Sequence, residues 1–131
     1  MQIFNTMTRR KEEFTPQKEG EYRIYVCGPT VYNYIHIGNA RPMIVFDTLR
    51  RYLEYCGNKV YYVSNITDID DKLIKKGQEE GTSMQEVARK FEAEYIKDSD
   101  GLNVMAPTVR PRATEHIGEI IGIVKDLVES G

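Results

Sequence analysis

Two β-rich runs on either side of an amphipathic helical pattern are the feature that most constrains the fold. The runs cover residues 22–27 and 60–64. Between them, apolar side chains recur at the spacing of one helical face, at Phe46, Leu49, Leu53 and Cys56. Parallel neighbouring strands need such a helical crossover. Residues 22–64 therefore predict a parallel βαβ core and an α/β fold, with Cys56 in the apolar interior.

Residues 67–131 follow mainly helical patterns. Asp68, Asp70 and Asp71 form an acidic cluster, which we interpret as helix-capping carboxylates and not as a metal site. Asp68 would start a short helix that continues to Lys76 and is stopped by glycines.

Two further helices are expected towards the end of the chain. Ser83 and Glu86 form a possible capping box that opens a helix to about Asp98. The last helix is expected over 113–129, with one apolar face formed by Ile117, Ile120, Ile121, Val124 and Val128. No third strand is visible, and a two-stranded parallel sheet is a poor structure by itself. We therefore expect an exposed apolar sheet edge.

Composition excludes several classes of protein. The 131 residues carry a net charge of −2 with 40% hydrophobic and 29% charged residues, which excludes disorder and a uniformly basic nucleic-acid binder. No apolar run approaches the roughly 20 residues of a membrane helix, so no membrane association is expected. The two cysteines make no disulfide framework and the N-terminus has no secretory pattern, so we expect a cytoplasmic protein.

The loop at residues 28–39 ends in the sequence His36-Ile37-Gly38-Asn39, where the predicted helix begins. A helix N-terminus offers unpaired N–H groups and a partial positive charge, which favours phosphate. Gly38 leaves room for a nucleotide to approach the backbone, while His36 and Asn39 can donate hydrogen bonds. This short string by itself is also compatible with a capping histidine and an ordinary turn.

The surrounding sequence resembles the cysteinyl-tRNA synthetases, a family of class I aminoacyl-tRNA synthetases. The block YVCGPTVYNYIHIGNAR at 25–41 is similar to the start of their active site, with Asn39 in place of the second histidine of the His-Ile-Gly-His signature. Further segments in the family's order are IFNT at 3–6, KEEF at 11–14, NITDIDDK at 65–72 and PRATEHI at 111–117. The resemblance covers essentially the whole chain.

This resemblance implies the first half of a class I Rossmann-like nucleotide-binding domain, in which residues 1–131 are the N-terminal part of the catalytic domain and 67–131 a mainly helical insertion. His36 and Asn39 would be catalytic, acting on the ATP phosphates. The implied ATP-binding residues are Gly28, Pro29, Thr30, His36, Gly38 and Asn39, and Mg²⁺ should accompany ATP. Those implied for the substrate are Thr30, Tyr32 and Thr67.

The resemblance also implies zinc, with Cys27 as one of four ligands, although a buried structural cysteine is the usual interpretation of such a residue. The implied reaction joins L-cysteine to tRNA(Cys) through cysteinyl-adenylate. The other zinc ligands and the Lys-Met-Ser-Lys-Ser loop have no match here, so we expect these 131 residues alone to be inactive. A cysteine:amino-sugar ligase and a non-enzymatic nucleotide- or cysteine-binding paralogue remain alternatives.

Overall fold

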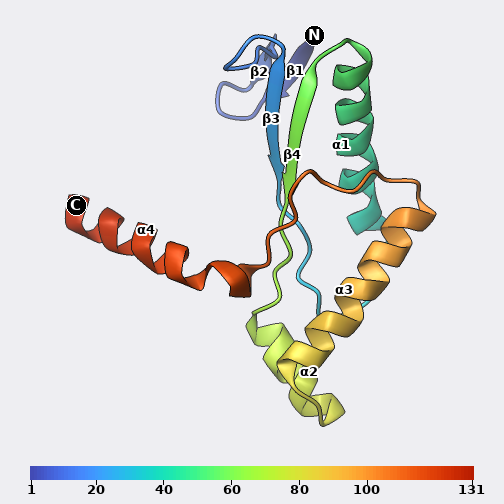
Figure 1. Ribbon diagram of the computed structural model, residues 1–131, viewed down its shortest axis with the longest axis vertical. Helices are drawn as coiled ribbons and strands as arrows, with labels where there is room; N and C mark the ends of the chain where they lie inside the picture. Colours follow the sequence, from blue (N-terminus) through green and yellow to red (C-terminus); the bar gives the residue numbers. More distant parts are fainter.

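A parallel pair of strands forms the centre of the computed structural model, which describes residues 1–131. Strand β3 (Glu21–Val26) pairs with β4 (Lys59–Ser64), with Tyr22 opposite Val60 and Val26 opposite Ser64. Helix α1 (Ile37–Tyr55) connects them and lies along one face of the sheet (Figure 1). The βαβ core and the α/β fold are therefore confirmed.

Side chains alternate between the two faces of the sheet along β3 and β4, and the apolar face is the one that α1 covers. Leu53 of α1 packs against Val60 and Tyr62 of β4 in a buried cluster, joined by half-buried Phe46, Leu49, Tyr22, Ile24 and Val26. On the opposite face Tyr25 is 64% exposed. The prediction that Cys56 is buried is wrong, because α1 ends at Tyr55 and Cys56, as its C-cap, is exposed.

Residues 108–113 run beside β4 as an irregular third strand, which the sequence did not predict. The Ser64 N–H donates to the Val109 carbonyl at 3.2 Å, and the Ile66 N–H donates to the Pro111 carbonyl at 2.8 Å. The bridges Val63 to Val109 and Ile66 to Arg112 are parallel. Proline has no N–H to donate, so Pro111 interrupts the ladder and obscures the strand pattern.

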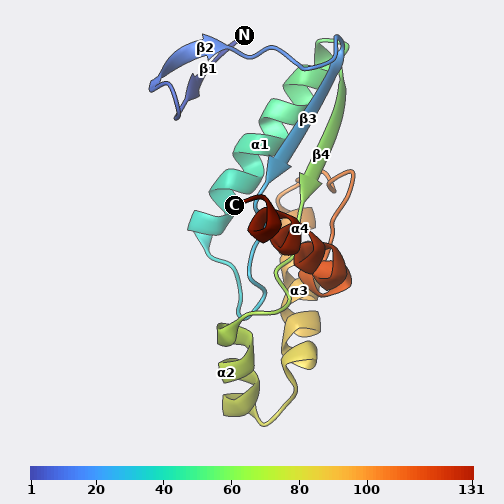
Figure 2. The same cartoon turned by 90° about the vertical axis from the view of Figure 1, so that its left-hand side faces the viewer.

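A β-hairpin precedes this sheet and projects away from it (Figure 2). Its antiparallel strands are β1 (Gln2–Asn5) and β2 (Arg10–Glu13). Arg9 closes the turn with a left-handed φ of 57°.

Helix α2 (Asp71–Glu80) starts later than predicted. Its N-cap is Asp70, whose carboxylate accepts from the Lys72 N–H at 2.8 Å. Asp68 is instead buried, and its carboxylate accepts from the backbone N–H and the hydroxyl of Thr114. The assignment of Asp68 as a cap is therefore wrong, because its partner lies 46 residues away in the chain.

Helix α3 (Met84–Gly101) follows antiparallel in space and begins with the predicted capping box. The Glu86 N–H donates to Ser83 Oγ at 3.2 Å, and the Ser83 N–H donates to Glu86 Oε2 at 3.1 Å. Val87 and Phe91 join Val31, Ile66 and other residues in the larger buried core. The helical pair therefore shares its core with the loop between β3 and α1.

Helix α4 (Ile117–Ser130) follows the 3-10 turn η1 (Ala113–His116) and extends away from the rest of the fold (Figure 1). The segment before it is fixed by Arg112, whose guanidinium donates to both carboxylate oxygens of buried Glu92 at 2.7–3.1 Å. The predicted apolar face is present but exposed, at Ile117, Ile120, Ile121, Val124 and Val128. None of the helices combines the length and apolar character needed to cross a bilayer.

The capping box of α3 predicts a defined loss of stability in acid. Hydrogen bonds from Thr82 and Ser83 lower the pKa of Glu86 to about 2 from 4.5. Because the folded pKa is depressed, the stabilisation is complete above pH 4.5 and is lost as pH falls towards 2. Glu86→Gln should make the melting temperature fall less steeply between pH 4.5 and pH 2 than it does in the wild type. The surface change Glu79→Gln should leave this pH dependence as it is. Identical pH profiles for wild type and Glu86→Gln would contradict this.

Candidate functional site

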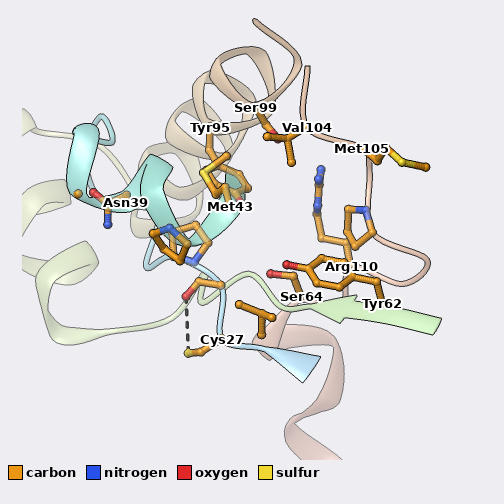
Figure 3. Close-up of a pocket in the computed structure, with 16 residues that line it drawn as sticks. Cys27, Asn39, Met43, Tyr62, Ser64, Tyr95, Ser99, Val104, Met105 and Arg110 are labelled. Atoms are coloured by element: carbon orange, nitrogen blue, oxygen red, sulfur yellow. Dashed lines mark hydrogen bonds between the residues drawn. The ribbon is translucent and has the colours of Figure 1, made fainter. Parts of the chain in front are cut away.

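A cavity of about 130 Å³ opens where the C-terminal end of β3 meets the first turn of α1 (Figure 3). Its other walls come from β4, α3 and the segment that follows α3. The lining includes the sequence-predicted residues Cys27, Gly28, Pro29, Gly38 and Asn39. The tertiary structure therefore brings together the two ends of the 28–39 loop.

Backbone pairing with the residues after β4 holds the start of this loop. The Thr67 N–H donates to the Pro29 carbonyl at 3.0 Å, and the Val31 N–H donates to the Thr67 carbonyl at 3.2 Å. The side chain of Val31 is buried in the larger core and is only 2% exposed. The loop is thus an extension of the parallel sheet and not a free segment.

Asn65 fastens the same turn through its side chain, and sequence reasoning gave it no role. Its Oδ1 accepts from the Gly28 N–H at 2.8 Å and from the Tyr25 hydroxyl at 3.0 Å. Its Nδ2 donates to Thr67 Oγ1 at 3.2 Å. The available signal was a polar residue directly after a strand, where parallel α/β folds build their sites.

Gly28 is required by the closeness of two backbone segments. A Cβ at this position would lie 1.6 Å from the Asn65 carbonyl oxygen and 2.7 Å from its carbonyl carbon. Neither backbone atom can move without breaking the pairing of the loop with the end of β4. The glycine therefore sets the width of the turn beside Cys27.

His36 and Asn39 close the N-terminus of α1 as a reciprocal capping box. His36 Nδ1 accepts from the Gly38 N–H at 3.0 Å, and Asn39 Oδ1 accepts from the His36 N–H at 3.1 Å. Because Nδ1 accepts, the proton of the neutral imidazole is on Nε2. The box therefore uses one acceptor from each side chain and leaves His36 Nε2–H and Asn39 Nδ2 as donors.

This geometry favours a negatively charged ligand. The two remaining side-chain donors are exposed and lie at the positive end of a 19-residue helix, whose first turn contains no acidic residue. Gly38 has a second role besides the predicted one, because a Cβ there would come within 2.7 Å of the His36 ring. The glycine thus lets the imidazole fold back and cap the helix.

Cys27 presents an exposed thiol at the end of β3. Its Sγ lies 3.7 Å from the carbonyl oxygen of the adjacent Gly28 (Figure 3), and the Tyr25 side chain is also a close neighbour. An accessible, weakly bonded sulfur fits the requirements of one metal ligand. No group of three potential His, Cys, Asp or Glu ligands gathers anywhere in the chain.

Thr30, Tyr32 and Thr67, predicted as substrate-binding residues, do not line the cavity. Thr30 and Thr67 face each other across the parallel bridge that extends the sheet. Tyr32 packs against the larger core, with Lys72 Nζ 5.2 Å from its ring centre. Tyr32 therefore has a packing role here, because the loop turns its ring towards α2.

Eleven of the 16 cavity residues were not predicted as site residues, and those among them with a polar side-chain group are Tyr62, Ser64, Tyr95, Ser99 and Arg110. Tyr95 lies on the buried face of α3 and is 8% exposed. The sequence held no signal for their convergence, since they come from β4, α3 and the segment after α3.

Comparison with known proteins gives the family of the chain. The sequence model of the tRNA synthetases class I (C) catalytic domain matches residues 13–131. The chain belongs to this class I synthetase family. It is 58% identical over all 131 residues to the cysteine–tRNA ligases of Lachnoclostridium phytofermentans, Lachnospira eligens and Clostridioides difficile. The chain spans 28% of the length of each of these relatives.

The family membership agrees with the resemblance that the sequence motifs indicated. The β3–α1–β4 core and the 28–39 loop both lie within the residues that the family model matches. The partial Rossmann-like fold is therefore formed by residues of the synthetase catalytic domain.

The close approach at Gly28 predicts a large effect of a small substitution. Gly28→Ala should destabilise the chain by about 3 kcal/mol, at the upper end of overpacking costs, because backbone atoms block the new methyl group. Gly122→Ala is a matched control in α4, where a Cβ has open space and alanine favours the helix by roughly 0.5–1 kcal/mol. Urea unfolding of both variants checks this, and equal midpoints would contradict the close approach.

Proposed function

We propose that this chain is part of a cysteine–tRNA ligase. In the proposed reaction ATP and L-cysteine form cysteinyl-adenylate and pyrophosphate, and the cysteinyl group then passes to the 3′ end of tRNA(Cys). The observation that carries the proposal is the capping box that leaves His36 Nε2–H and Asn39 Nδ2 as donors at a helix N-terminus. The names of the relatives, over the whole chain, support the choice of substrate.

The proposed catalytic strategy is positioning with electrostatic stabilisation. His36 and Asn39 would donate to oxygens of the transferring phosphates, and the α1 N-terminus would add a fixed positive potential. The turn at Gly28, Pro29 and Thr30, held by Asn65, would keep one wall of the nucleotide site rigid. Mg²⁺ would enter with ATP and neutralise phosphate charge.

Cys27 is proposed as a zinc ligand, with the remaining ligands supplied by residues outside these 131. Zinc prefers thiolate sulfur to a neutral hydroxyl, so a zinc that also binds the substrate side chain would favour cysteine over serine. Within this chain, the contribution of Cys27 is an accessible sulfur on a turn fixed by Asn65.

We assign residues 1–131 to the N-terminal part of a cytoplasmic enzyme's catalytic domain. Residues 22–64 form its βαβ core, 28–39 its signature loop, and 67–131 its mainly helical insertion. In this proposal, most contacts with tRNA belong to other parts of the enzyme.

His36→Asn separates the proposed phosphate contact from helix capping. Asparagine is a good N-cap, so α1 should remain intact, but it cannot place a donor where Nε2–H lies. In the full-length protein, cysteine-dependent ATP–pyrophosphate exchange should fall by about 10²–10³-fold in kcat, the usual cost of losing one such donor. The KM for cysteine should change much less.

His116→Asn is the matched control, because His116 is the other histidine and lies in η1. It should retain the exchange rate. A His36→Asn enzyme that loses cysteine affinity instead of turnover would remove His36 from the phosphate role.

Cys27→Ser tests the metal assignment. The full-length variant should retain less zinc after dialysis and discriminate less between cysteine and serine, since serine is a poor zinc ligand. Cys56→Ser should keep the wild-type zinc content, because Cys56 lies at the far end of α1. Metal analysis that finds equal zinc in wild type and Cys27→Ser would overturn the assignment.

A further inference from the structure

The inner part of the cavity contains four hydroxyl groups without a hydrogen-bond partner in the chain. They belong to Tyr62, Ser64, Tyr95 and Ser99, which are 8%, 9%, 8% and 3% exposed. No side-chain oxygen sealed from solvent is unpartnered in this structure, so these four hydroxyls must reach open space. Figure 3 shows their side chains around a common volume between β4 and α3.

The electrostatic character of this volume is positive. Arg110 is the only charged residue among those that line the cavity, and no aspartate or glutamate does so. Its guanidinium lies 5.8 Å from the centre of the Tyr95 ring and takes part in none of the chain's ion pairs. The nearby carboxylate of Asp47 is already bonded to Arg51 at 2.6 Å and to the Met105 N–H at 2.9 Å.

From this convergence, we propose that Tyr62, Ser64, Tyr95, Ser99 and Arg110 form a binding chamber for a small oxyanion, a phosphate or a carboxylate. We call these five residues the hydroxyl chamber. The proposal goes beyond the proposed function, in which none of the five has a role. A guanidinium with several hydroxyl donors is a favourable environment for an oxyanion, because charge-assisted hydrogen bonds are stronger than neutral ones.

The size of the cavity limits the ligand. At about 130 Å³ it is similar to cavities of roughly 150 Å³ that hold one benzene molecule, so an anion of a few heavy atoms fits inside it, whereas a whole nucleotide would extend beyond it. The chamber is therefore distinct in capacity from the phosphate contacts proposed at His36, although both adjoin the first turn of α1.

The protonation of the tyrosines agrees with a donor role. Burial raises the pKa of Tyr62 and of Tyr95, so both hydroxyls remain protonated at neutral pH. Two protonated phenols, two serine hydroxyls and a guanidinium give five donor groups that could serve one anion.

The test uses full-length protein and calorimetric titration with inorganic phosphate and, separately, with acetate, at constant ionic strength. Wild type should bind one equivalent of at least one of them, and the arm that saturates identifies phosphate or carboxylate as the ligand. Arg110→Gln should weaken binding at least tenfold, because it removes the only charge. Tyr95→Phe and Ser99→Ala should each weaken binding severalfold with little change in shape.

Two controls keep the interpretation specific. Arg89→Gln removes an exposed arginine of α3 and should bind as wild type does. His116→Asn removes a histidine of η1 that does not line the cavity, and it should also bind as wild type does. If Arg110→Gln does not fold, the comparison of Tyr95→Phe with Ser99→Ala decides the question.

Three results would overturn the proposal. The first is no saturable binding of either anion to wild type, which would mean a water-filled cavity only. The second is unchanged binding in Arg110→Gln or, if that variant does not fold, in both hydroxyl variants. The third is loss of binding in His36→Asn, which would place the anion at the α1 N-terminus.

Discussion

The carboxamide of Asn65 is the interaction on which the candidate site depends. One side chain bonds the Gly28 N–H, the Tyr25 hydroxyl and Thr67 Oγ1, and thereby joins the ends of both parallel strands. This clamp operates only because residue 28 is glycine, since any side chain would collide with the Asn65 carbonyl. The position of Cys27, at the end of β3, follows from the same clamp.

Helices α2 and α3 pack against the loop that follows β3 and help to hold it in place. Val31 of the loop is buried against α2 and α3, and the Tyr34 ring meets Phe91 edge-on with centres 5.2 Å apart. The loop is therefore held by backbone pairing on one side and by apolar packing on the other. Such rigidity is what positioning of a phosphate requires, because the donors must be in place before the ligand binds.

Much of the fold could be predicted from sequence, but less of the site. The helical face at Leu53 and the capping box at Ser83 were visible because both depend on residues at most a few positions apart. Sequence reasoning also singled out the loop at 28–39, but it did not anticipate that Tyr32 packs against the core and gave Asn65 and Arg110 no role. Their roles depend on neighbours contributed by other elements, which no local pattern records.

The sequence by itself determined the parallel βαβ unit, the capping of α3 and the start of α1 at the 36–39 string, because periodicity and capping are local properties. Only the tertiary structure decided that residues 108–113 pair with β4, that Asp68 bonds Thr114 rather than starting a helix, and that four hydroxyl-bearing residues and Arg110 line one cavity. These contacts join residues tens of positions apart, so they exist only once the sheet and helices have packed.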